Sequence, residues 1–146
     1  MEQPQYNMFH RKRFEDEIAP LAKEFGLGLT TFSPLYFGIL TGKYNEYLPD
    51  GSRATLEGMS WMKENLTQDR ISTVKELGVV AKDLGISQAQ LAIAWILRRK
   101  VVSSVITGAT KLSQLEDNLG AADAQELITP NVLGIIDHIL SPQAVP

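Results

Sequence analysis

Apolar and polar residues follow two different periods along the chain, and the changes of period divide it into strands and helices. Residues 27–32 alternate and include β-branched side chains, which predicts a strand, and residues 101–107 predict another. Residues 3–9 contain Gln, Tyr, Met and Phe close to a proline, and predict the beginning of a further strand. Helical segments separate these runs, so the order of elements is that of an α/β protein with parallel strands.

Helices are predicted where apolar residues recur at intervals of three and four. The helix over residues 88–99 is apolar nearly all round and should be buried. Other helices are predicted over residues 68–84, from 112 to Gly120 and from 130 onward, with a short one near Trp61. The first helix presents one apolar face and ends at Gly26, and that face comprises Phe14, Ile18, Leu21, Ala22 and Phe25.

Capping residues mark several of these boundaries. The sequence Ser87-Gln88-Ala89-Gln90 is a capping box, and Thr129 followed by Pro130 is typical of a helix start. Thr110 follows the strand 101–107 and Gly108, where it is placed to cap the next helix. A helix N-terminus in that position also favours an anion.

The stretch after the strand 27–32 is a long loop that reaches about residue 57. It contains Gly38, Gly42 and Lys43, and later the turn signal Pro49-Asp50-Gly51. Pro34 is expected to hold the preceding serine in an extended conformation. Such a loop at the carboxyl end of a strand is typical of a ligand site, although the same residues also fit an ordinary turn with a solvated lysine.

Composition narrows the classes of function. The 146 residues suit one domain, and no apolar run approaches the length of a membrane span. The absence of cysteine excludes thiolate chemistry and Cys-ligated metals and favours a cytoplasmic location, while His10 and His138 are too few for a His-rich metal site. The net charge of −3 argues against general nucleic-acid binding. The first residues lack the pattern of a signal peptide.

Several motifs in order resemble the C-terminal half of an aldo-keto reductase, in the branch that includes the potassium channel beta subunits. They are QPQYNMF, TTFSPLYFGILTGKY, SRATLEG, SQAQLAIAWILRR and SSVITGATKLSQLEDNLGA. The fold implied by the resemblance is a (β/α)8 TIM barrel. Residues 1–146 would then be a single partial barrel domain that supplies the last three strands and their helices.

The resemblance also implies an NADP(H) site. Gln3 would hydrogen-bond the nicotinamide carboxamide, and Phe32 would stack on its ring. Three further groups would complete the site. The loop around the pyrophosphate is Ser33, Pro34, Leu35, Gly38 and Lys43; Ser52 and Arg53 would hold the phosphates; and the adenosine end with its 2′-phosphate would meet Gly108, Thr110, Gln114, Asp117 and Asn118. Without the resemblance, the same residues read as core or solvated surface positions.

Two classes of function follow from the resemblance. In the first, NADPH gives hydride to a small carbonyl substrate, while the family's catalytic Asp, Tyr, Lys and His lie outside this chain. Tyr36 and Phe37, bulkier than the family's usual residues, would narrow the substrate mouth. In the second, the chain is a non-catalytic module that senses nucleotide or docks to a channel. A piece without a function of its own is a third reading. Open strand edges favour a homo-oligomer or another protein partner.

Overall fold

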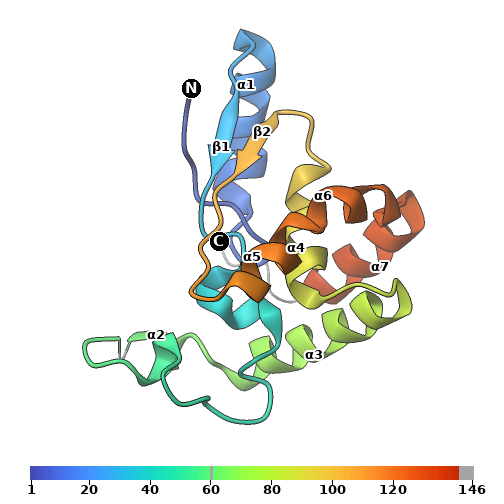
Figure 1. Ribbon diagram of the computed structural model, residues 1–146. Coiled ribbons are helices and arrows are strands. Elements are labelled where there is room, and N and C mark those ends of the chain that lie inside the picture. Colours follow the sequence, from blue (N-terminus) through green and yellow to red (C-terminus); the bar gives the residue numbers. More distant parts are fainter. Residues whose placement is uncertain (60, 142–146) are drawn as a thin grey trace.

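The chain folds as a small parallel sheet with helices around it in the computed structural model (Figure 1), which describes residues 1–59 and 61–141. The α/β class predicted from the sequence is confirmed. In chain order the elements are a π-helical turn Phe14–Ile18, α1 Ala19–Phe25, β1 Leu29–Thr31, 3-10 turns Tyr36–Thr41 and Arg53–Thr55, α2 Trp61–Glu64, α3 Gln68–Asp83, α4 Gln88–Leu97, β2 Val102–Val105, α5 Leu112–Leu119, α6 Ala121–Ala124, a 3-10 turn Gln125–Leu127 and α7 Pro130–Leu140. No helix in the described ranges is both long and apolar enough to cross a bilayer.

The two strands lie side by side and run in the same direction. Thr31 of β1 is opposite Val105 of β2, and an irregularity after Leu29 shifts the register within the pair. The Ile106 amide donates to the Thr31 carbonyl at 2.8 Å, which extends the pairing beyond the last residue of β2. Because the strands are parallel, both of their carboxyl ends meet at one edge, the lower side in Figure 1.

The third strand predicted, over residues 3–9, is only partly formed, so the prediction of three continuous strands was wrong. The segment runs parallel to β1 and bonds to it, since the Thr30 amide donates to the Glu2 carbonyl and the Phe32 amide to the Pro4 carbonyl, each at 3.1 Å. These contacts are isolated bridges, not a ladder. With β2 already bonded to β1, this segment occupies the other edge of β1.

Two features of the sequence stop that third strand. Pro4 has no N–H to donate to a ladder. Asn7 then turns the chain, because its Oδ1 accepts from the amides of Phe9 at 3.0 Å and His10 at 2.9 Å. This local side-chain bonding competes with strand pairing and outweighs it.

The first helix differs from the single apolar face that was predicted. A π-helical turn, Phe14–Ile18, precedes α1, and Pro20 in the first turn of α1 lacks the N–H that would bond back into that turn. The extra residue in the π turn rotates the rest of the helix. Phe14 is therefore buried, whereas Leu21 and Phe25 are 51% and 67% exposed. Gly26 ends α1 at φ 65°, as predicted.

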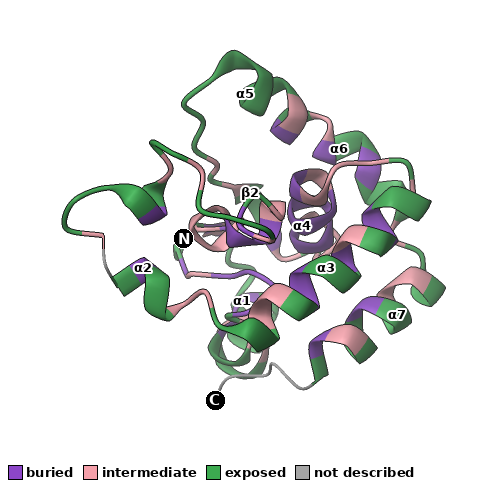
Figure 2. Cartoon of the chain, turned by 90° about the horizontal axis from the view of Figure 1, so that it is seen from below, coloured by how far each residue is buried: buried purple, intermediate pink, exposed green. Residues whose placement is uncertain are grey.

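The core is built around α4, which is buried along almost its whole length, as its composition predicted (Figure 2). The predicted capping box is present at its start, with Ser87 accepting from the Gln90 amide and Gln90 bonding back to the Ser87 amide. Trp95 is fully buried and lies 5.0 Å from Tyr6 between ring centroids. Helices α3 and α7 pack on each other outside α4, and Thr129 caps α7 as predicted.

Candidate functional site

The first of the predicted site residues lie near the carboxyl edge of the sheet. Figure 2 shows the molecule from this lower side. Along β1, Leu29 and Thr31 are buried, and Phe32 alternates to the opposite face, where it is 40% exposed. Gln3, on the neighbouring N-terminal segment, is also exposed. Phe32 forms a parallel backbone bridge with Gln5, two residues after Gln3, so the two predicted nicotinamide-binding residues lie on neighbouring segments.

The loop after β1 has an unusual backbone. Ser33, Tyr36 and Phe37 have φ values of 56°, 44° and 60°, although each carries a Cβ, and Gly38 follows at 92°. These left-handed conformations are sparsely populated for residues other than glycine and cluster at functional sites in proteins. Sequence reasoning did not find them, because a positive φ at a non-glycine residue leaves no pattern in the sequence.

The extended conformation predicted for Ser33 was wrong. The preference that Pro34 imposes is local, and two hydrogen bonds to the Ser33 carbonyl oppose it. The Asn7 side-chain amide donates to that carbonyl at 2.9 Å, and the Tyr36 amide donates to it at 3.1 Å. Together they orient the peptide after Ser33 and turn the chain sharply. Pro34 is buried beneath this turn, and Leu35 packs against the core.

Lys43 lies next to this turn. A Cβ added to Gly38 would lie 2.8 Å from Lys43 Nζ, so the end of the lysine side chain lies against Gly38, whose φ of 92° favours glycine. The Nζ is also 4.9 Å from the centroid of the Tyr44 ring, and the side chain remains exposed. The loop therefore presents one cation above its strained backbone.

Ser52 and Arg53 lie further along the chain, between the 3-10 turn Tyr36–Thr41 and α2. Arg53 opens a 3-10 turn and is exposed. The Ser52 Oγ is buried and has no hydrogen-bond partner within the described part of the chain. A buried hydroxyl without a partner is costly and marks a place where a ligand or water can be accommodated. Within the described residues, no hydrogen bond joins either side chain to the segment after β2.

The segment after β2 begins with exposed Gly108 and Thr110. Thr110 does not cap α5 as predicted, because the helix starts one residue later than a Thr110 cap requires, with Lys111 in the cap position. Instead, the Thr110 amide and hydroxyl donate to Gln114 Oε1, at 2.9 Å and 3.2 Å. Thr110 and Gln114 are thus brought together on the exposed surface.

Asp117 and Asn118 lie on the same side of α5 as Gln114, three and four residues further on, but both are less exposed. Asp117 Oδ2 accepts a hydrogen bond of 2.8 Å from Ser87 Oγ, which ties α5 to the first turn of α4. Asn118 is buried, with 7% of its surface exposed. Contact of these two side chains with a ligand stays a prediction, since their described contacts are internal.

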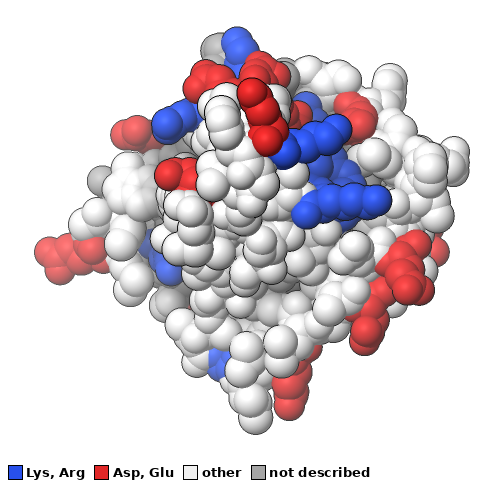
Figure 3. Space-filling view, turned by 90° about the horizontal axis from the view of Figure 1, so that it is seen from above, with Lys and Arg blue, Asp and Glu red and all other residues white. Residues whose placement is uncertain are grey.

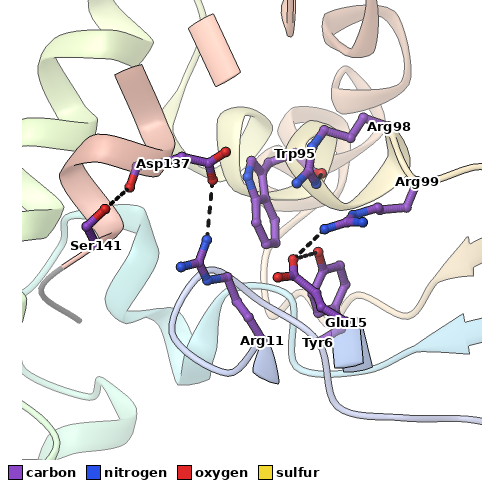
Figure 4. Close-up of polar contacts among 8 residues, drawn as sticks. All are labelled: Tyr6, Arg11, Glu15, Trp95, Arg98, Arg99, Asp137 and Ser141. Atoms are coloured by element: carbon purple, nitrogen blue, oxygen red, sulfur yellow. Dashed lines mark hydrogen bonds and ion pairs between the residues drawn. The ribbon is translucent and has the colours of Figure 1, made fainter. Parts of the chain in front are cut away.

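A partly buried polar cluster joins the N-terminal segment, the first helix and the end of α4, and it was not found from the sequence (Figure 4). Tyr6 OH donates to Glu15 Oε1 at 2.7 Å, and the same oxygen accepts from Arg99 at 2.6 Å. The Arg98 guanidinium lies 4.2 Å from the Trp95 ring centroid. Burial raises the pKa of Tyr6, with the hydrogen bond to Glu15 as the second cause, and burial lowers the pKa of Arg98. The sequence indicated only cations at a helix end.

Charges of both signs lie close together on the upper face of the molecule (Figure 3). Lys and Arg side chains gather beside Asp and Glu side chains there, and much of the surface between them is uncharged. The face is therefore mixed in charge rather than uniformly basic.

Comparison with known proteins identifies the class. Residues 1–141 match the Aldo/keto reductase family. A relative from Arabidopsis thaliana and one from Oryza sativa subsp. japonica are each 46% identical over 142 residues, which is 96% of this chain. Both carry the name "Probable voltage-gated potassium channel subunit beta". The chain spans 43% of the length of each. It belongs to the aldo/keto reductase family, and the predicted resemblance to channel beta subunits is confirmed.

Proposed function

We propose that this chain is the NADP(H)-binding part of an aldo-keto reductase and forms the last three strands of its (β/α)8 barrel. The observation that carries the proposal is the carboxyl edge of the sheet. There the exposed ring of Phe32 is followed directly by the left-handed turn at Ser33, and the parallel β2 leads into Gly108. Ligands of α/β proteins bind at such an edge.

The residues present fit a phosphorylated dinucleotide. A nicotinamide ring needs a flat apolar face, which Phe32 offers, and its carboxamide needs a partner such as the exposed Gln3. Phosphates need cations and donors, and exposed Lys43 and Arg53 together with the unpartnered Ser52 Oγ supply them. When bound, the dinucleotide supplies a hydride for a carbonyl carbon. The part of this chain is to hold and orient it, while the proton donor belongs to the family's tetrad outside these residues.

A second candidate is a non-catalytic module that binds nucleotide and docks to a channel. The observation that favours it is the name that the plant relatives carry, voltage-gated potassium channel subunit beta. Both candidates need the same dinucleotide site, and both include a cytoplasmic location. They differ in whether a carbonyl substrate is reduced. Oxidation of NADPH by an aldehyde with the purified chain would contradict the non-catalytic candidate.

The first test is a fluorescence or calorimetric titration of the 146-residue chain with NADPH and with NADH. We expect NADPH to bind more tightly, because exposed Arg53 and Lys43 attract the additional phosphate. Arg53→Ala should weaken NADPH binding about tenfold, because a charge-assisted hydrogen bond is lost. The same variant should weaken NADH binding much less. Arg13→Ala is the matched control, since the Arg13 side chain is 75% exposed on the first helix.

Two results would reject the assignment. One is equal loss of NADPH and NADH affinity in Arg53→Ala. The other is an unmodified chain that melts cooperatively yet binds neither dinucleotide at millimolar concentration.

A further inference from the structure

The left-handed turn after β1 needs support from outside itself. Tyr36 and Phe37 have φ values of 44° and 60°, a region that glycine enters freely and that side chains with a Cβ enter rarely. Both side chains are large, so their own contacts must hold the backbone there. Such strain persists in proteins only where the surroundings over-determine it.

The surroundings of Tyr36 are built by Asn65 and Arg70. Tyr36 OH donates to Asn65 Oδ1 at 2.9 Å, and Arg70 donates from one guanidinium nitrogen to the same oxygen at 2.8 Å and to the Asn65 carbonyl at 3.2 Å. The Asn65 side-chain amide donates to the Trp61 carbonyl at 3.0 Å. Every group of the Asn65 side chain is therefore engaged, which fixes its orientation.

Aromatic packing completes the support. The Arg70 guanidinium carbon lies 5.3 Å from the Tyr36 ring centroid and 5.8 Å from that of Phe9, so the cation sits over two rings. Phe37 lies edge-on to Trp61 with 4.8 Å between centroids, and 5.2 Å from Tyr36. The two residues with strained backbones are thus each packed on one side by the α2 to α3 region.

We propose that Arg70 is a positioning residue for the loop after β1. With Asn65 it locks Tyr36 in its left-handed conformation, and Tyr36 in turn fixes the backbone from Ser33 to Gly38. We name Tyr36, Asn65 and Arg70 the arginine latch. That the fixed loop receives a dinucleotide rests on the proposed function. Arg70 acts from α3, outside the loop, and among the described residues it reaches the loop through Tyr36 and the shared asparagine.

The test begins without cofactor, so that it is independent of the proposed function. Amide hydrogen exchange is measured at Gly38 and Leu40, whose amides donate to the Leu35 carbonyl within the turn. In Arg70→Ala we expect exchange at both amides to accelerate at least tenfold, with exchange within α4 unchanged. Lys82→Ala removes an exposed cation elsewhere on α3 and should change neither.

NADPH affinity is then measured in the same variants. Arg70→Ala should weaken binding at least fivefold with little change in melting temperature, and Lys82→Ala should not. Arg70→Lys should not restore affinity, because a lysine lacks the planar fork that bonds Asn65 and covers the rings. Tyr36→Phe keeps the ring and removes one hydrogen bond, and should accelerate loop exchange by a smaller factor, still within a folded protein.

The possible results test the arginine latch and the proposed function separately. Unchanged exchange at Gly38 and Leu40 in both Arg70→Ala and Tyr36→Phe would overturn the latch, and so would full rescue by Arg70→Lys. Accelerated exchange with unchanged NADPH affinity would overturn its positioning role. If the unmodified chain does not bind NADPH, the proposed function fails, and the exchange data alone judge the latch. If Arg70→Ala does not fold, Tyr36→Phe carries the same comparison.

Discussion

Tyr6 shows how one residue links the sheet to the helices behind it. Its ring is fully buried, stacked on Phe14 at 3.8 Å between centroids and tilted against Trp95. Its hydroxyl donates to Glu15 Oε1 at 2.7 Å. Burial, followed by that hydrogen bond, raises the pKa of Tyr6 above the value of about 10 for an exposed phenol. The native protein therefore holds this proton at pH values where the unfolded chain releases it.

Stability should consequently fall in alkali because of Tyr6. Below pH 10 the folded and the unfolded protein both hold the Tyr6 proton, so the contribution of Tyr6 to stability is complete. Above pH 10 the unfolded protein loses the proton first, and the free energy of unfolding falls by up to about 1.4 kcal/mol per pH unit. Urea unfolding between pH 8 and 11 should show the advantage of the natural protein over Tyr6→Phe shrinking as pH rises. Tyr47→Phe, at a site that is 70% exposed, should show no such trend. Parallel curves for the natural protein and Tyr6→Phe would contradict this.

Among elements, α4 depends on a single serine at its start. Ser87 Oγ accepts from the Gln90 amide at 3.0 Å and donates to Asp117 Oδ2 at 2.8 Å. One hydroxyl thus closes the capping box of α4 and fastens α5 to it. Its removal leaves an orphan helix amide and a half-buried carboxylate without this donor.

We expect Ser87→Ala to lower the free energy of unfolding by about 1–2 kcal/mol, with the helix cap as the larger part. Ser113→Ala, at an exposed position on α5, is the control and should cost well under 0.5 kcal/mol. Denaturant unfolding monitored by circular dichroism measures both. A loss for Ser87→Ala no greater than that of the control would show that the capping box adds nothing measurable.

For the whole molecule, exposed apolar surface and open strand edges are the main liability. The outer edge of β2 and that of the N-terminal segment carry no partner strand within the described ranges. On α5, Leu112, Leu115 and Leu119 fall at helical spacing and are 70%, 43% and 67% exposed. Such a stripe together with open edges is typical of an interface or an aggregation hazard.

The isolated chain should therefore self-associate. Sedimentation velocity at micromolar concentration is expected to show species larger than the 16.2 kDa monomer. Replacing Leu112 and Leu119 by glutamate should shift the distribution toward the monomer, because charge on the stripe opposes burial. The same paired replacement of the exposed Leu21 and Phe25 on α1 tests whether the change in self-association is specific to α5. A monodisperse, cooperatively melting natural chain would contradict the expectation.

Local signals predicted the elements well where one residue decides the outcome. Ser87 and Thr129 cap helices in the structure, and Gly26 ends α1 at φ 65°. The buried α4 and the parallel strands followed equally from composition and order. These features depend on a residue and its nearest neighbours, so the sequence alone determines them.

The remaining features were decided by contacts between distant segments. Asn7 reaches the Ser33 carbonyl and overrides the preference set by Pro34, and Asp117 finds Ser87 rather than solvent. Tyr36 takes its left-handed backbone where Asn65 and Arg70 hold its ring and hydroxyl. In each case tertiary hydrogen bonds compete with a local preference of the backbone. The sequence shows the local preference but not the tertiary hydrogen bonds. The sequence by itself thus determined the main helices and the two parallel strands, and packing decided how far the N-terminal segment pairs and which conformation the loop after β1 adopts.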